Sequence, residues 1–108
     1  MYNTRHMPTR QEGRVSVEEH VVFGTGGGRD LHCDVFLPPE PGSDRTAILL
    51  VHGGGWLQGD RSQLRGYGIL LARYGFVCVA SEYRLSGEAV WPAQINDVKA
   101  ALRWLRAN

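Results

Sequence analysis

The sequence has 108 residues, 43% of them hydrophobic, which is enough apolar material for the core of one domain or part of one. Its 12 Lys and Arg residues nearly balance its 11 Asp and Glu residues, so we expect no nucleic acid partner. No apolar run approaches the length of a membrane span, and we expect a cytoplasmic protein without a membrane segment.

The cysteines and histidines are not spaced as metal ligands. Cys33 and Cys78 each lie within an apolar segment, where a free thiol behaves as a small buried side chain, so we expect no disulfide. The histidines are separated from one another and from any cysteine pair: they are His6, His20, His32 and His52. The sequence predicts no metal site and no cofactor.

Two half-buried strands are predicted after a loose leader at residues 1–14. Apolar residues recur at every second position over 15–23 and again over 31–37. The glycine-rich residues 24–28 between them accept positive φ, which suits a hairpin. A phosphate-binding loop is the weaker interpretation, since such a loop opens a helix and this one leads into another strand.

The middle of the chain alternates between strands and a helix. Prolines and Gly42 interrupt the pattern after residue 37, and residues 47–51 then form a continuous apolar run typical of a strand inside a parallel sheet. A helix is predicted over 62–74, weakened by Gly66 and Gly68 and ended by Gly75. Residues 76–80 form a second fully apolar strand.

The last element is a helix that starts near Trp91-Pro92 and runs to the end of the chain. Its predicted apolar stripe consists of Trp91, Ile95, Val98, Leu102 and Leu105. Asp97 is predicted to lie mostly off this stripe. The whole order predicts an α/β fold in which an antiparallel hairpin leads into a parallel sheet flanked by helices.

One segment has a composition that fold-building alone does not explain. It is His52-Gly53-Gly54-Gly55-Trp56, directly after the strand at 47–51. Three consecutive glycines are costly to order, and they are useful where a backbone must turn sharply and present N–H groups to a ligand atom. An oxyanion hole needs such donors. A glycine-rich turn without a catalytic role is the alternative, and the two large flanking side chains favour the functional interpretation.

This loop, the following helix, a strand leading into Tyr83-Arg84-Leu85 and the Trp-Pro helix start resemble the α/β-hydrolase superfamily. The resemblance covers residues 15–108 and is closest to esterases and lipases related to hormone-sensitive lipase and to small bacterial carboxylesterases. It implies an incomplete α/β-hydrolase domain, the N-terminal portion, and a small carboxylic ester as substrate.

The resemblance also implies roles for individual residues. Gly54 and Gly55 would donate backbone N–H groups to the oxyanion, while Gly53 and His52 would shape the loop. Trp56 would line the acyl or alcohol pocket, although a purely structural role is an equal alternative. In the neighbouring segments, Asp60 would cap or brace the loop and Arg84 would form a buried ion pair.

The catalytic triad is not found in this sequence. None of its serines lies in a G-x-S-x-G nucleophile elbow, and the resemblance places nucleophile, acid and base beyond Asn108. We therefore expect the chain to need a C-terminal half as partner. Two alternatives remain open, an aryl-formamidase or other amidase of the same fold and a catalytically inactive binding module.

Overall fold

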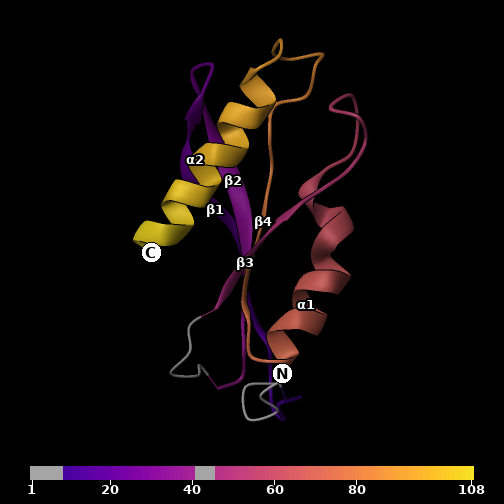
Figure 1. The fold of residues 1–108 in the computed structure, drawn as a ribbon, viewed down its shortest axis with the longest axis vertical. Helices are drawn as coiled ribbons and strands as arrows, with labels where there is room; N and C mark the ends of the chain where they lie inside the picture. Colours follow the sequence, from indigo (N-terminus) through magenta and orange to yellow (C-terminus); the bar gives the residue numbers. More distant parts are fainter. Residues whose placement is uncertain (1–8, 41–45) are drawn as a thin grey trace, which may run out of the picture.

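The computed structural model describes residues 9–40 and 46–108. Four strands and two α-helices follow one another, with a short 3-10 helix η2 before the first α-helix (Figure 1). In chain order the elements are β1 (Ser16–Gly26), β2 (Arg29–Leu37), β3 (Ala47–Val51), η2 (Arg61–Leu64), α1 (Arg65–Arg73), β4 (Val77–Ser81) and α2 (Ala93–Ala107). The expected α/β arrangement is confirmed, and β3 has the predicted bounds.

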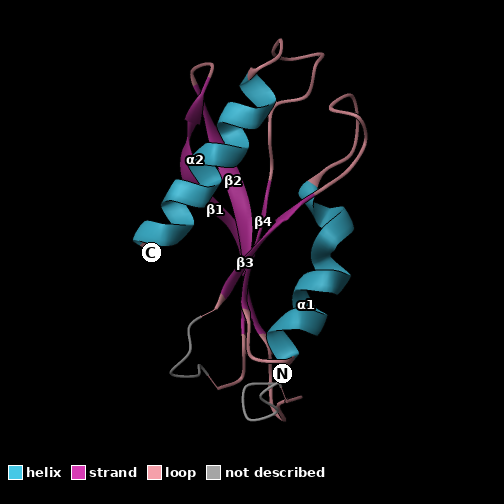
Figure 2. Cartoon of the chain, viewed as in Figure 1, coloured by secondary structure: helices cyan, strands magenta, loops and turns pink. Residues whose placement is uncertain are grey.

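The strands form one mixed sheet with the order β1-β2-β4-β3. β1 pairs with β2 and β2 with β4 in antiparallel fashion, whereas β3 and β4 run parallel and are joined through α1. α1 and α2 cover opposite faces of the sheet (Figure 2). Within the described residues, β3 is an edge strand whose outer side pairs with no strand.

The hairpin between β1 and β2 has a two-residue turn. Gly27 and Gly28 have φ of +58° and +81°, and the flanking Gly26 pairs with Arg29. Positive φ at both central positions matches the twist of the strands, which explains the glycines. The hairpin prediction is therefore confirmed, although β1 extends three residues further than the predicted strand, because Thr25 and Gly26 continue the ladder.

Two apolar clusters hold the sheet between the helices. Leu31, Cys33 and Val79 pack under α2, while Phe36 and Cys78 pack under α1. The two thiols thus lie on opposite faces, and both are free, as expected. Burial raises the pKa of each thiol to about 11, so neither is a nucleophile near neutral pH.

α1 is held against β2 by a close contact at a glycine. A methyl group at Gly68 would lie 2.6 Å from the ring of the fully buried Phe36, whereas one at Gly66 would meet nothing within 4 Å. The first turn of the predicted helix is η2 rather than α-helix. Gly75 has φ of +95°, which agrees with its predicted role in ending the helix.

The buried face of α2 differs from the predicted stripe. Trp91 and Leu102 are 58% and 38% exposed, whereas Asp97 is 3% exposed and faces the protein interior. The charge of Asp97 misled the sequence analysis, because Arg84 neutralises it through contacts at 2.8 and 2.9 Å. The prediction of a buried ion pair for Arg84 is confirmed, and its guanidinium also lies close against the backbone of Gly26.

Part of the predicted leader, residues 1–8, lies outside the described residues, as do residues 41–45 between β2 and β3. Further along, the Gln11 N–H donates to the carbonyl of Arg73 at 2.7 Å, and the Arg73 guanidinium donates to the carbonyl of Gly13 at 2.9 Å. These bonds tie residues 11–13 to the end of α1. No helix within 9–40 and 46–108 is long and apolar enough to cross a membrane.

Candidate functional site

Residues 52–60, here called the glycine loop, connect the end of β3 to η2. The Leu57 N–H donates to the carbonyl of Gly54 at 3.1 Å and closes a tight turn. Gly55 and Trp56 occupy its two central positions with φ of +64° and +67°. This left-handed conformation is energetically unfavourable for a residue other than glycine, so the contacts of Trp56 must stabilise it.

Gly54 and Gly55, the last two glycines of the motif, are both exposed but are not equivalent. Gly54 has φ of +131°, and a side chain there would overlap the carbonyl of Gln58. Gly55 faces open space. The N–H groups of Gly54 and Gly55 make no hydrogen bond to any described residue. The loop therefore exposes these two adjacent backbone donors at the carboxyl end of β3.

His52 begins the glycine loop and is locked by Tyr83, which follows β4. The side chains are buried and their rings stack at 4.2 Å. The Tyr83 hydroxyl donates to the carbonyl of His52 at 2.8 Å, and Nδ1 of His52 lies 2.9 Å from the carbonyl of Gly53. A carbonyl only accepts, so Nδ1 of His52 is the donor in this contact. Burial raises the pKa of Tyr83 and keeps it a donor.

Trp56 packs against aromatic side chains from two later segments. Its ring contacts Tyr83 edge-on at 4.8 Å and lies 5.4 Å from the ring of Trp91. Ser86 holds the backbone, since its N–H and its hydroxyl donate to the carbonyl of Trp56 at 2.7 and 3.1 Å. Contacts of this kind offset the left-handed conformation and hold the turn in one geometry.

The glycine loop ends in a helix cap. Asp60 accepts a hydrogen bond from the Ser62 N–H at 2.8 Å, and the Gln63 side chain accepts one from the Asp60 N–H at 2.9 Å. These bonds form a capping box, so the predicted capping role of Asp60 is confirmed. The hydrogen bonds from Ser62 also lower the pKa of the Asp60 carboxyl.

A pocket of about 420 Å³ lies next to the glycine loop. His52, Leu57, Gly59 and Asp60 line it from the loop, whereas Gly54, Gly55 and Trp56 do not. Its remaining walls come from β2, from η2 and from the segment after β4: they are Arg29, Arg61, Glu82, Tyr83, Leu85, Gly87 and Glu88. Most of these residues were not predicted from the sequence, because they have no common motif.

Arg29 organises the far wall of this pocket. Its guanidinium binds both oxygens of Glu88, at 2.5 and 3.0 Å, and lies 3.2 Å from Glu82. Burial raises the pKa of Glu82, but hydrogen bonds from the His32 N–H and from Arg29 outweigh burial and hold the pKa below its usual value. Hydrogen bonds to Glu88 and Glu82 in turn raise the pKa of the Arg29 guanidinium. This wall is therefore a set of fixed charges rather than a set of proton donors.

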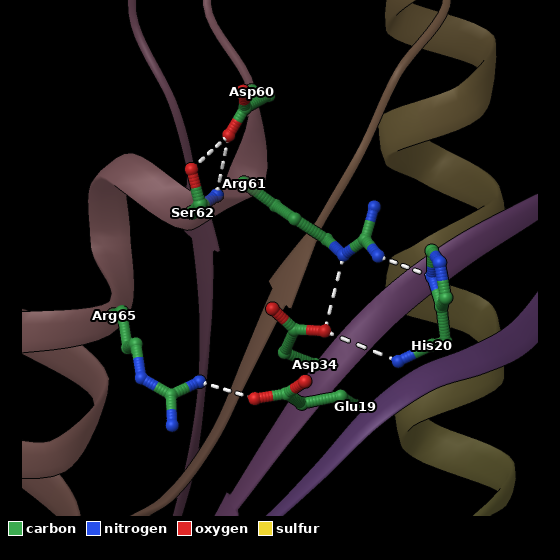
Figure 3. Close-up of a pocket in the computed structure, with 7 residues that line it drawn as sticks. All are labelled: Glu19, His20, Asp34, Asp60, Arg61, Ser62 and Arg65. Carbon is green, nitrogen blue, oxygen red and sulfur yellow. Dashed lines mark hydrogen bonds and ion pairs between the residues drawn. The ribbon is translucent and has the colours of Figure 1, made fainter.

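A second, more polar pocket of about 300 Å³ lies where η2 faces β1 and β2 (Figure 3). Arg61 donates from Nε to Asp34 at 3.1 Å and contacts Nδ1 of His20. Arg65 donates to Glu19 at 2.6 Å. The sequence analysis also missed this cluster. Its one local signal is Asp34, a charged residue inside an apolar strand.

The described residues contain no complete catalytic triad. None of their serines hydrogen-bonds a histidine, and Ser81, at the end of β4, is fully buried with its hydroxyl unpaired. Within residues 9–40 and 46–108, no three His, Cys, Asp or Glu side chains are grouped as metal ligands.

Comparison with known proteins agrees with this arrangement. Esterase LipQ of Mycobacterium tuberculosis is 31% identical over 111 aligned residues, which cover 100% of this chain and 26% of LipQ. Esterase LipC of the same organism is 40% identical over 74 residues, or 67% of this chain and 17% of LipC. The chain thus spans about a quarter or less of the length of these curated relatives.

Solved structures share the fold. A bacterial heroin esterase superposes with a TM-score of 0.76 and 30% identity, covering 86% of this chain and 30% of the esterase. The BD-FAE family model matches residues 33–108, which include β3, the glycine loop and α2. The chain therefore belongs to the BD-FAE family of α/β-hydrolases.

Proposed function

We propose that this chain supplies the oxyanion-binding loop of a carboxylic-ester hydrolase, with the N–H groups of Gly54 and Gly55 as the two donors. The observation that carries the proposal is that both donors lack an acceptor among the described residues and lie on an exposed turn directly after a sheet strand. Water pairs such exposed donors in the free chain, and two adjacent donors in an ordered turn can bind a ligand oxygen in its place.

The chemistry of ester hydrolysis explains why such donors must be rigid. Attack on the carbonyl carbon moves negative charge onto the carbonyl oxygen, and donors already in position stabilise that charge without reorganising. The Tyr83 hydrogen bond to His52 and the Ser86 hydrogen bonds to Trp56 supply this rigidity. In the proposed enzyme, Gly53 shapes the turn with His52, and Trp56 lines the acyl or alcohol pocket.

The nucleophile, acid and base of the proposed enzyme would come from a C-terminal segment beyond these residues. The 108 residues contain no G-x-S-x-G sequence, whereas relatives such as LipQ are longer and are named esterases. That name favours a carboxylic ester over an amide as the substrate class. Small acyl esters are therefore the first substrates to test.

The test joins residues 1–108 to the C-terminal part of LipQ and measures hydrolysis of p-nitrophenyl acetate. Gly54→Ala should lower kcat by about 100- to 1000-fold, because its side chain would overlap Gln58 and displace the donors. KM should change little, since the loss falls on the transition state. Gly66→Ala, a glycine replaced on the exposed surface of α1, is the matched control and should leave both constants unchanged. A Gly54→Ala enzyme with normal kcat would refute the proposal.

A further inference from the structure

The C-terminal end of the glycine loop is attached to the sheet by a side chain that carries no role so far. Asp60 hydrogen-bonds Ser62 and Gln63, so the helix cap is satisfied within its own turn. Arg61, the next residue, instead reaches across to β2 and β1 (Figure 3). Leu64 packs into the core only one turn later. Arg61 is therefore the first residue after the loop that contacts the sheet through its side chain.

The carboxylate that Arg61 contacts is buried. Asp34 is 7% exposed, and its Oδ1 accepts hydrogen bonds from Nε of Arg61 at 3.1 Å and from the His20 N–H at 3.2 Å. A buried carboxylate is costly without a cation, so Asp34 holds the guanidinium in place much more strongly than an exposed partner would. The loop end thereby acquires a fixed point on β2.

His20 gives the guanidinium a second contact and fixes its orientation. An arginine side chain only donates, so Nδ1 of His20 accepts from the Arg61 guanidinium. His20 reaches this position because β1 bulges between Glu18 and Val21 and His20 adopts φ of +58°. Asp34 and His20 therefore accept from two different nitrogens of one planar group.

A neighbouring ion pair in the same pocket lacks these properties. Arg65 and Glu19 are 2.6 Å apart, but their side chains are 48% and 61% exposed. The Arg61 and Asp34 side chains are only 17% and 10% exposed. Water and salt screen the exposed pair, so it contributes little to the position of the helix. Arg65 therefore serves as an exposed control for the buried Arg61 within the same pocket.

We propose that Arg61 is a positioning residue for the oxyanion donors: its contacts with Asp34 and His20 hold the C-terminal end of the glycine loop against the sheet. The proposal rests on the proposed function of that loop. It requires that loss of Arg61 loosens residues 52–60 before it loosens the sheet, and that the arginine fork, rather than charge alone, supplies the restraint.

Hydrogen exchange of the 108-residue chain, followed by mass spectrometry, tests the loop directly. In Arg61→Met, the hydrogen-bonded N–H groups of Leu57 and Asp60 should exchange about tenfold faster or more, while a peptide covering β4 stays within about twofold of the wild type. Arg65→Met is the matched control and should leave the loop unchanged. Arg61→Lys keeps the charge but cannot span both acceptors, so its loop should exchange at an intermediate rate. If Arg61→Met unfolds the sheet as well, Arg61→Lys decides, and a loop that exchanges like the wild type would overturn the proposal.

The fusion with the LipQ C-terminal part separates this proposal from the proposed function. Arg61→Met should lower kcat there with KM nearly unchanged, and Arg61→Lys should restore part of the loss. If the loop loosens but Gly54→Ala leaves kcat normal, the positioning role of Arg61 for that loop holds and the oxyanion assignment fails. If Gly54→Ala abolishes turnover while the Arg61→Met loop exchanges like the wild type, the oxyanion assignment holds and the role of Arg61 fails.

Discussion

Two glycines on one helix should respond in opposite directions to the same substitution. Replacing glycine by alanine inside a helix contributes about 0.8–1.0 kcal/mol from backbone propensity alone. At Gly66 a methyl group meets no atom within 4 Å, so Gly66→Ala should stabilise the chain by up to that amount. At Gly68 the methyl group would lie 2.6 to 2.8 Å from three carbons of the Phe36 ring.

The ring of Phe36 is fully buried and cannot move aside without disturbing the cluster under α1. Overpacking of this kind costs about 1–3 kcal/mol, which exceeds the propensity gain over most of its range. Gly68→Ala should therefore destabilise the chain by up to about 2 kcal/mol. Urea unfolding monitored by circular dichroism measures both variants, and Phe36→Leu in the Gly68→Ala background should recover part of the loss. If Gly68→Ala stabilised the chain as much as Gly66→Ala does, the described packing of α1 on β2 would be incorrect.

Four further predictions concern the site and the sheet. Tyr83→Phe removes the donor to the buried carbonyl of His52 and should cost about 1–3 kcal/mol in urea unfolding, and a loss below about 0.5 kcal/mol would contradict that bond. The lowered pKa of Glu82 means that its carboxylate stabilises the folded chain above about pH 4.5, and that this contribution is lost as the pH falls through the folded pKa. Glu82→Gln should therefore lower the free energy of unfolding at pH 7, and the difference between variant and wild type should shrink below pH 4.5. The isolated chain should not react with a fluorophosphonate probe, and stoichiometric labelling of one serine would show that a nucleophile was overlooked. The isolated chain should self-associate through the outer side of β3, and a monodisperse monomer at high concentration in analytical ultracentrifugation would count against this.

Features of the fold that depend on neighbouring residues in the sequence were predictable. The apolar run of β3 and the two glycines of the hairpin turn are local signals, and the structure has both where the sequence placed them. The interior face of α2 was not predictable in the same way, because Asp97 is buried only by virtue of Arg84, thirteen residues earlier. A charged residue is assigned to the surface by default unless its partner is known.

The same distinction applies to the candidate site. The glycine loop is contiguous, so its composition alone predicts an unusual backbone, and the resemblance to the α/β-hydrolases implied the capping role of Asp60, whose partners Ser62 and Gln63 are near neighbours. The contacts of Arg61 with Asp34 and His20 join residues 27 and 41 positions apart. They exist only because η2 is folded over the first two strands, and no spacing within the sequence encodes that approach.

The contact between Arg84 and Gly26 restricts how this family member can vary. An ideal Cβ at position 26 would lie 2.8 Å from both Cζ and Nε of Arg84. A free arginine could swing away, but Asp97 holds this one through two side-chain hydrogen bonds. Any larger residue at position 26 would therefore have to arise together with a change at position 84 or 97. These three positions, on the hairpin, after β4 and on α2, should covary among close relatives as one evolutionary unit.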